Sequence, residues 1–120
     1  MKKSGSRRIE RLKDLILEEV SRVLLMEVKD PRIGMVTVTG VELSQDIRIA
    51  RFFYCVGKDA DGSLIKDTQK GLESASGFIR STLAANLNLK RTPEIFFVYD
   101  KTLDYGEKID KILEDLKEES

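Results

Sequence analysis

The chain contains no histidine, no tryptophan and a single cysteine among its 120 residues. Without histidine it lacks the usual general base, the common zinc ligand and the base of a Ser-His-Asp triad. Cys55 alone forms neither an internal disulfide nor a cysteine zinc site, and its strand-like surroundings favour a half-buried core thiol. The absence of tryptophan leaves the core to Leu, Ile, Val and Phe. We therefore expect no catalytic residue, no metal site and no cofactor.

Long hydrophobic runs are also missing. The longest aliphatic stretch, Val23 to Met26, is far too short to span a bilayer. Lys2 and Lys3 imitate the start of a signal peptide, but acidic residues from Asp14 onward interrupt the apolar segment that such a peptide needs. These features predict a cytoplasmic protein with no membrane partner, and we also expect a monomer. A chain of this length fits one domain with a single core.

The chain has no net charge, because 21 basic residues balance 21 acidic ones. A general attraction to nucleic acid is therefore not expected. The charges are nevertheless uneven: basic residues dominate positions 1–13 and 79–91, whereas acidic residues dominate from 101 onward. Such polarity would orient the molecule on RNA, although a run of like charges is equally consistent with a solvated helix face.

The first half of the chain shows a helical period followed by two strand periods. Apolar residues three and four positions apart predict an amphipathic helix from Ile9 to Leu24. Asp30-Pro31 closes this region, because proline disfavours helix at the residue before it. Alternating β-branched residues then predict a strand over 35–39. An aromatic-rich run predicts its hairpin partner over 47–56, after a polar turn.

A second helical pattern runs from Leu64 to Leu87 and is interrupted by Ala75-Ser76-Gly77. Glycine inside a helix costs about 1 kcal/mol relative to alanine, so we expect the helix to break here and turn backbone N–H groups near Ser76 outward. A packing glycine with no ligand is the competing interpretation. Glu94 to Tyr99 is predicted to be a third strand, which a helical crossover allows to run parallel to a neighbour.

The acidic C-terminal segment is predicted to form a final helix, with Asp104 and Glu107 spaced as in a capping box at its start. Its apolar residues recur at helical intervals and need a surface to cover: Ile109, Ile112, Leu113 and Leu116. We therefore divide the chain into a flexible basic N-terminus (1–6), a KH-like domain (7–103) and an acidic helix and tail (104–120). The α+β order, helix-strand-strand-helix-kink-helix-strand with a C-terminal helix, is that of a single type II KH-like domain.

Three further patterns are better explained by structure than by chemistry. The aromatic runs at 52–54 and 96–99 lack the glycine pattern of an RRM, so core packing accounts for them. Asp46 and Asp104 stand where turns and helix starts commonly use aspartate, which favours a structural role over hydrolysis. Gly57-Lys58 lacks the other residues of a P-loop.

Four segments of the chain occur together in a distinctive order: 29–34 (KDPRIG), 36–44 (VTVTGVELS), 75–80 (ASGFIR) and 91–94 (RTPE). With them the chain resembles the bacterial ribosome-binding factor A family from about residue 7 to 116. The resemblance implies a small non-enzymatic assembly factor that binds the small ribosomal subunit and its ribosomal RNA. It also implies a role in late maturation of that subunit, particularly in the cold. In this family an Ala-x-Gly kink replaces the Gly-x-x-G loop of ordinary KH domains, and Ala75-Ser76-Gly77 fits that replacement.

The RNA contact that this resemblance implies depends on shape and phosphate charge, with weak sequence readout. The ordinary Gly-x-x-G grip on a single strand is not expected, because Gly71 is followed three places later by Ser74. We predict contacts from the first helix, the kink and the loop before the third strand: Arg7, Arg8, Arg11, Ala75, Ser76, Gly77, Arg80, Lys90 and Arg91. The alternative is a KH-like protein-interaction module without direct RNA binding, which the neutral net charge and acidic tail would suit.

Overall fold

The computed structural model describes residues 2–33, 36–57 and 61–100, with side chains from residue 7 onward. Its elements follow in the order α1 (Lys2–Met26), β1 (Thr37–Leu43), β2 (Ile49–Cys55), α2 (Gly62–Leu87) and β3 (Glu94–Tyr99). This order confirms the predicted α+β, type II KH-like class. The helix predicted over 104–120 lies outside the described residues.

The first helix forms where the sequence predicts it, because its apolar residues share one side. Ile16, Val20 and Val23 lie three and four positions apart and are fully buried against the rest of the core. The helix begins at Lys2, so the expected boundary between a basic N-terminus and the domain falls inside α1.

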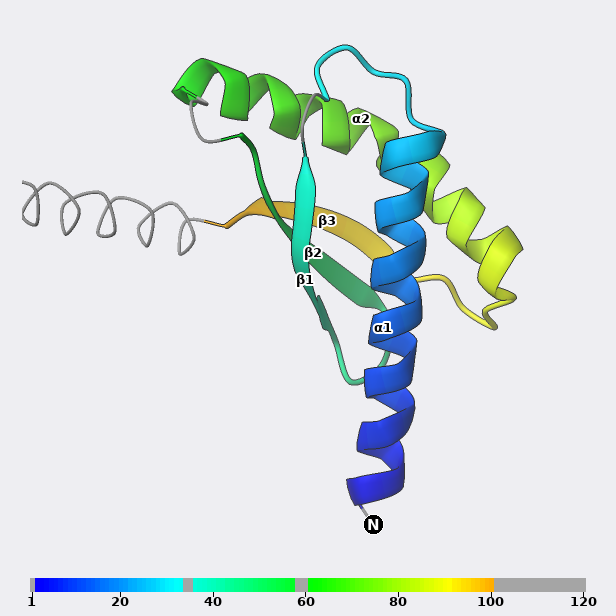
Figure 1. Ribbon diagram of the computed structural model, residues 1–120. Coiled ribbons are helices and arrows are strands. Elements are labelled where there is room, and N and C mark those ends of the chain that lie inside the picture. The colour runs from blue at the N-terminus through cyan, green and yellow to red at the C-terminus, as the bar shows by residue number, and fades with distance from the viewer. Residues whose placement is uncertain (1, 34–35, 58–60, 101–120) are drawn as a thin grey trace, which may run out of the picture.

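The three strands form one mixed sheet in the order β1-β2-β3 (Figure 1). β1 pairs antiparallel with β2 as a hairpin, and β3 pairs parallel with β2, as the crossover through α2 allows. The predicted third strand and its parallel direction are therefore confirmed. Both helices contribute to a single core against the sheet, and α1 stands in front of the strands in the view of Figure 1.

The strand predicted over 35–39 is displaced in the structure. β1 begins at Thr37 and continues to Leu43, and its register with β2 shifts between Val38 and Gly40. Such a shift is a β-bulge, in which one extra residue interrupts the simple alternation of side chains. The bulge explains why an alternating pattern alone did not predict the second half of the strand.

The predicted break at Ala75-Ser76-Gly77 is wrong, because α2 is one helix from Gly62 to Leu87. Its buried positions keep a helical spacing on both sides of Gly77: Thr68, Gly71, Leu72, Ile79 and Leu83. Packing on one continuous face therefore holds the helix together through the glycine. Figure 1 shows that α2 changes direction near its middle without interruption. Helices commonly bend at Gly and Ser residues, so a change of direction within one unbroken helix replaces the predicted break.

Aromatic residues fill the centre of the sheet's inner face. Phe52, Tyr54 and Phe97 are buried, and the Phe52 and Phe97 ring centroids lie 5.7 Å apart. Core packing therefore explains these three rings, whereas Phe96 in the second run is exposed on the other face. Cys55 is half-buried, also as predicted.

Candidate nucleic-acid interface

The N-terminal half of α1 carries a cluster of exposed arginines, here called the α1 cluster: Arg7, Arg8 and Arg11. Residues three and four apart are neighbours on a helix surface, so each of the first two guanidinium groups lies beside that of Arg11. None of the three forms an ion pair within the described part of the chain, whereas nearby Glu10 is 3.4 Å from Lys13. Like charges at this spacing repel one another. An anion bound here would relieve that repulsion.

A second basic group, here called the loop cluster, consists of Arg80 on α2 and of Lys90 and Arg91 in the turn after it. Asn88 ends the helix in the left-handed conformation, with φ of 51°, and the chain then turns toward β3. Lys90 and Arg91 are exposed on this turn. Their side chains are therefore available to a partner.

Arg80 differs from the other predicted cations because it is already engaged. Its Nε donates to the carbonyl of Pro93 at 3.2 Å, and its Nη2 donates to the carbonyl of Thr92 at 3.1 Å. The guanidinium thus braces the loop that displays Lys90 and Arg91. Its planar fork makes two such bonds from one rigid group. Pattern reading of the sequence did not reveal this structural role.

The bend in α2 does not present backbone N–H groups in the way predicted. In a continuous helix those groups point along the axis to carbonyls one turn earlier. The Ser76 hydroxyl donates to the carbonyl of Glu73 at 2.7 Å, and half-buried Ala75 packs against the core. Gly77 is exposed, and a Cβ there would meet nothing within 4 Å. What remains at this position is a bare stretch of helix surface that a partner can approach closely.

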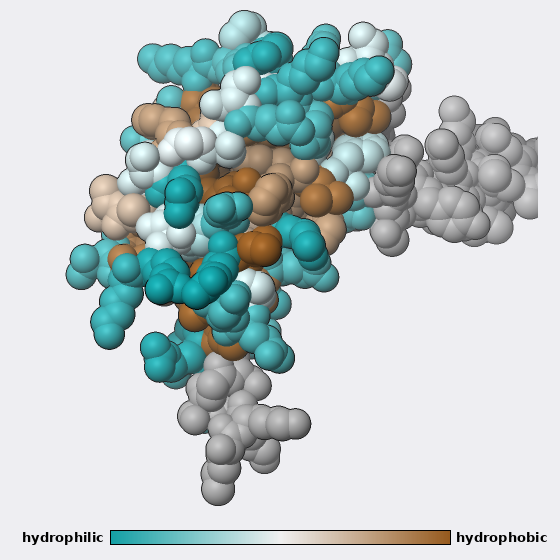
Figure 2. All heavy atoms as spheres, turned by 180° about the vertical axis from the view of Figure 1, so that it is seen from behind, coloured by the Kyte–Doolittle hydropathy of each residue, from teal (hydrophilic) through white to brown (hydrophobic). Residues whose placement is uncertain are grey.

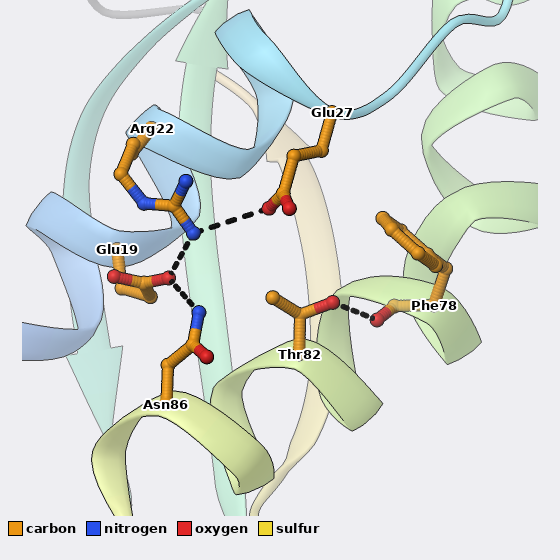
Figure 3. Close-up of polar contacts among 6 residues, drawn as sticks. All are labelled: Glu19, Arg22, Glu27, Phe78, Thr82 and Asn86. Carbon is orange, nitrogen blue, oxygen red and sulfur yellow. Dashed lines mark hydrogen bonds and ion pairs between the residues drawn. The ribbon is translucent and has the colours of Figure 1, made fainter.

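Polar contacts fix α1 against the last turns of α2 (Figure 3). Glu19 accepts a bond of 2.7 Å from the Asn86 side chain, and Arg22 bonds to both Glu19 and Glu27. These hydrogen bonds, that of Arg22 first, lower the pKa of Glu19. Sequence reasoning missed this group, although the i,i+3 spacing of Glu19 and Arg22 was a signal for a pair.

This junction relates the two basic clusters to each other. Arg8 precedes Glu19 by about three helical turns, so both residues lie on the same side of α1, roughly 17 Å apart along its axis. Lys90 and Arg91 of the loop cluster follow Asn86 closely in sequence, and Figure 1 shows the end of α2 and its loop beside α1. The structure therefore places the α1 cluster and the Lys90–Arg91 turn on either side of one junction, while Ser76 and Gly77 lie about three turns before Asn86 in α2.

An open groove of about 500 Å³ lies between α2 and the edge strand β3. Its lining residues come from three elements: Arg51, Gln69, Glu73, Ser76, and Ile95 to Val98. On its inner side Gln69 donates to the carbonyl of Phe97 at 2.9 Å and accepts from the buried Tyr54 hydroxyl. Burial, with the nearby charge of Glu73, raises the pKa of Tyr54 to about 12. Apart from Ser76, the groove contains none of the predicted RNA-binding residues.

The residues considered for hydrolysis or metal binding form no such site among the described residues. Asp46 accepts from the Ser44 hydroxyl at 2.7 Å and from the Arg48 N–H at 3.2 Å, which confirms its turn role. Asp104 lies outside the described residues. Within the part of the chain that the structure describes, no three His, Cys, Asp or Glu residues gather as metal ligands. Neither described helix is long and apolar enough to cross a membrane.

Comparison with known proteins agrees with the fold and with the resemblance. A Thermodesulfovibrio yellowstonii ribosome-binding factor A is 44% identical over 114 residues, which cover 95% of this chain and 94% of the relative. A Thermotoga maritima protein solved by NMR is 33% identical, with a TM-score of 0.65 over 74% of this chain and 83% of that one.

A Thermus thermophilus ribosome binding factor A, fitted into a cryo-EM map of its complex with the 30S subunit, shares the fold. Its TM-score is 0.61 at 20% identity, over 76% of this chain and 93% of that one. The profile of one family, Ribosome-binding factor A, matches residues 8–113. Because this match spans most of the sequence, the chain belongs to the ribosome-binding factor A family.

Proposed function

We propose that the protein binds the small ribosomal subunit and assists late steps of its assembly, including in the cold. Membership of the ribosome-binding factor A family supports the assembly role, and the fold shared with a relative fitted to the 30S subunit supports this partner. The family is one of ribosome-binding factors rather than a known enzyme class, so the role is binding without catalysis. Such a partner implies action in the cytoplasm.

The contact surface in this proposal consists of the α1 cluster and the exposed part of the loop cluster, together with the exposed helix surface at Gly77. The observation that carries it is the unpaired state of Arg7, Arg8 and Arg11 within the described part of the chain. An arginine guanidinium that is not held in an ion pair is available to phosphate oxygens, whose geometry it matches. Ribosomal RNA is thus the component that this surface would contact, through backbone phosphates rather than base edges.

Salt dependence of binding to purified small subunits tests this contact. Each phosphate contact releases condensed counterions, so neutralising one reduces the slope of log affinity against log salt by roughly one unit. We expect Arg8→Gln and Arg91→Gln to reduce both the affinity and the slope. Lys66→Gln, an exposed cation on α2 outside both clusters, is the matched control and should behave as wild type.

The alternative is a protein-interaction module without direct RNA contact. The apolar groove beside β3 and the neutral net charge favour it. In that case Arg8→Gln and Arg91→Gln would retain the wild-type affinity and salt slope. Phe96→Ser at the rim of the groove would instead weaken subunit binding.

A further inference from the structure

The face of the sheet that points away from the helices carries exposed hydrophobic side chains. Because strand residues alternate, burial of Phe52 and Phe97 against the helices directs their neighbours to the opposite face. We call the apolar residues there the outer sheet patch: Ile49, Phe53, Phe96 and Val98. Three of them are 37%, 47% and 38% exposed, for Ile49, Phe96 and Val98 respectively.

The patch is continuous across two strands. In the parallel register Phe53 lies opposite Val98, and Arg51 lies opposite Phe96. The groove between α2 and β3 reaches this face, because Phe96 and Val98 line its outer side. Seen from behind, the molecule shows hydrophobic residues gathered near its middle with polar residues around them (Figure 2). Contiguous apolar surface of this kind marks a binding site.

The charges around the patch do not suit a nucleic acid. Arg51 is the basic residue within it and lies 3.8 Å from Glu42 on the neighbouring strand. Glu94, at the start of β3, shares the outer face with Phe96 and is exposed. The acidic groups therefore offset the cation, in contrast to the α1 cluster. The occupant has to be mainly apolar.

The end of β3 lies at the margin of this face. The Asp100 N–H donates to the Tyr54 carbonyl at 2.7 Å, and its carboxylate accepts from the Thr39 hydroxyl at 3.0 Å. Thr39 lies in β1, so the Asp100 side chain reaches across the end of β2. By alternation Asp100 is on the same face as Phe96 and Val98. The segment after it therefore starts at the margin of the outer sheet patch.

We propose that this segment, residues 101–120, folds back and covers the outer sheet patch with its apolar stripe. The stripe consists of Ile109, Ile112, Leu113 and Leu116. A helix over 107–117 would be about 16 Å long, close to the roughly 20 Å of a six-residue strand. Gly106 provides the freedom for the reversal before it. The acidic residues of the segment then face solvent, away from the basic clusters.

Disulfide trapping in the full-length protein tests the contact. In a Cys55→Ser background, Arg51→Cys places one thiol inside the patch without removing an apolar residue. It is combined with Leu113→Cys in the stripe or, as the matched control, with Asp115→Cys on the opposite side of the same segment. We expect the pair with Leu113→Cys to form an intramolecular disulfide at least about tenfold faster at low protein concentration, because packing raises the effective concentration of the two thiols. Equal rates for the two pairs would overturn the proposal, and so would disulfides formed mainly between molecules, which indicate a second copy.

Hydrogen exchange provides a second measurement that needs no cysteine. Ile112→Asp combined with Leu113→Asp should speed amide exchange in β2 and β3 by about tenfold, since the cover over these strands is lost. Lys111→Asp changes the charge of the same segment outside the stripe and should leave exchange unchanged. Wild-type exchange in the stripe variant contradicts the proposal. Neither result bears on the salt dependence of the basic clusters, so the two proposals fail separately.

Discussion

Gly71 and Gly77 stand six positions apart in α2 and have different reasons to be glycine. A Cβ at Gly71 would lie 2.9 Å from Ile33 Cγ1 and 3.1 Å from Arg32 Cβ, whereas one at Gly77 would meet open space. Gly71 therefore allows the loop after α1 to pack directly on α2, where the Arg32 carbonyl also lies 3.3 Å from the Thr68 hydroxyl. Close packing therefore requires a glycine at position 71, whereas no neighbouring atom requires one at position 77.

Alanine at these two positions should have opposite effects on the free energy of unfolding. Gly77→Ala gains about 1 kcal/mol of helix propensity without a clash. Gly71→Ala gains the same propensity but forces the loop outward, and overpacking typically costs about 1–3 kcal/mol. In urea unfolding, the free energy of unfolding should therefore be higher than wild type for Gly77→Ala and lower than wild type for Gly71→Ala. Equal effects would mean that the loop moves aside freely.

In the same loop, the contact between Asp30 and Arg32 makes the stability of the protein depend on pH. Arg32 donates to the Asp30 carboxylate through Nε at 3.0 Å and Nη2 at 2.7 Å, and these bonds lower the pKa of Asp30 to about 2. A depressed pKa in the folded state contributes stability above the unfolded pKa, near 4, and loses it as pH falls toward 2. Between pH 5 and 2 the free energy of unfolding should therefore fall more steeply for wild type than for Asp30→Asn. Parallel pH curves for the two proteins would exclude this pair as a cause.

At the scale of elements, Gln69 joins α2 to two strands. Its side chain accepts from the Tyr54 hydroxyl on β2 and donates to the Phe97 carbonyl on β3. Because Tyr54 is fully buried, its hydroxyl depends on this partner. The amide thus connects the edge strand, the sheet centre and the helix.

Replacing Gln69 with methionine keeps the length of the side chain and removes both bonds. We expect Gln69→Met to lower the free energy of unfolding by about 1–3 kcal/mol, since a buried hydroxyl is left without a partner. Adding Tyr54→Phe removes the orphaned hydroxyl and should restore part of the loss. A double variant that loses the sum of both single effects would show that the two groups do not interact.

At the scale of the whole molecule, the balanced net charge conceals separate basic and acidic regions. The described ion pairs lie at the surface, and exposed pairs contribute little to stability. We therefore expect the Tm to change little as salt increases. Subunit affinity should fall with salt, and each phosphate contact should add roughly one unit to the slope of log affinity against log salt. A Tm that falls in parallel with affinity would place the charges in the fold rather than in the interface.

Arg80 tests how the fold and the interface are coupled. Arg80→Gln removes the two bonds that brace the loop before β3, so stability should fall by about 1 kcal/mol along with subunit affinity. Arg91→Gln is its matched comparison and should reduce affinity at unchanged Tm, because its side chain is exposed on the loop. Thermal unfolding alone distinguishes the two variants.

The sequence by itself determined the kind and order of the elements. Side-chain periodicity is a local property, so Ile16, Val20 and Val23 predict α1 and Glu94 to Tyr99 predicts β3 without any knowledge of their partners. The crossover length likewise allowed a parallel third strand. The exposed arginines of α1 follow from the same pattern, since they lie off its apolar stripe.

Only the tertiary structure decided whether α2 continues through Gly77, which side chains join separate elements and which face of the sheet is exposed. Glycine propensity predicts a break at Gly77, but burial of Leu72 and Ile79 on one face keeps α2 whole, because packing energy exceeds a local cost of about 1 kcal/mol. The Arg80 brace and the outer sheet patch depend on residues distant in sequence. Pattern reading reports what each segment prefers, whereas these features depend on which segments meet.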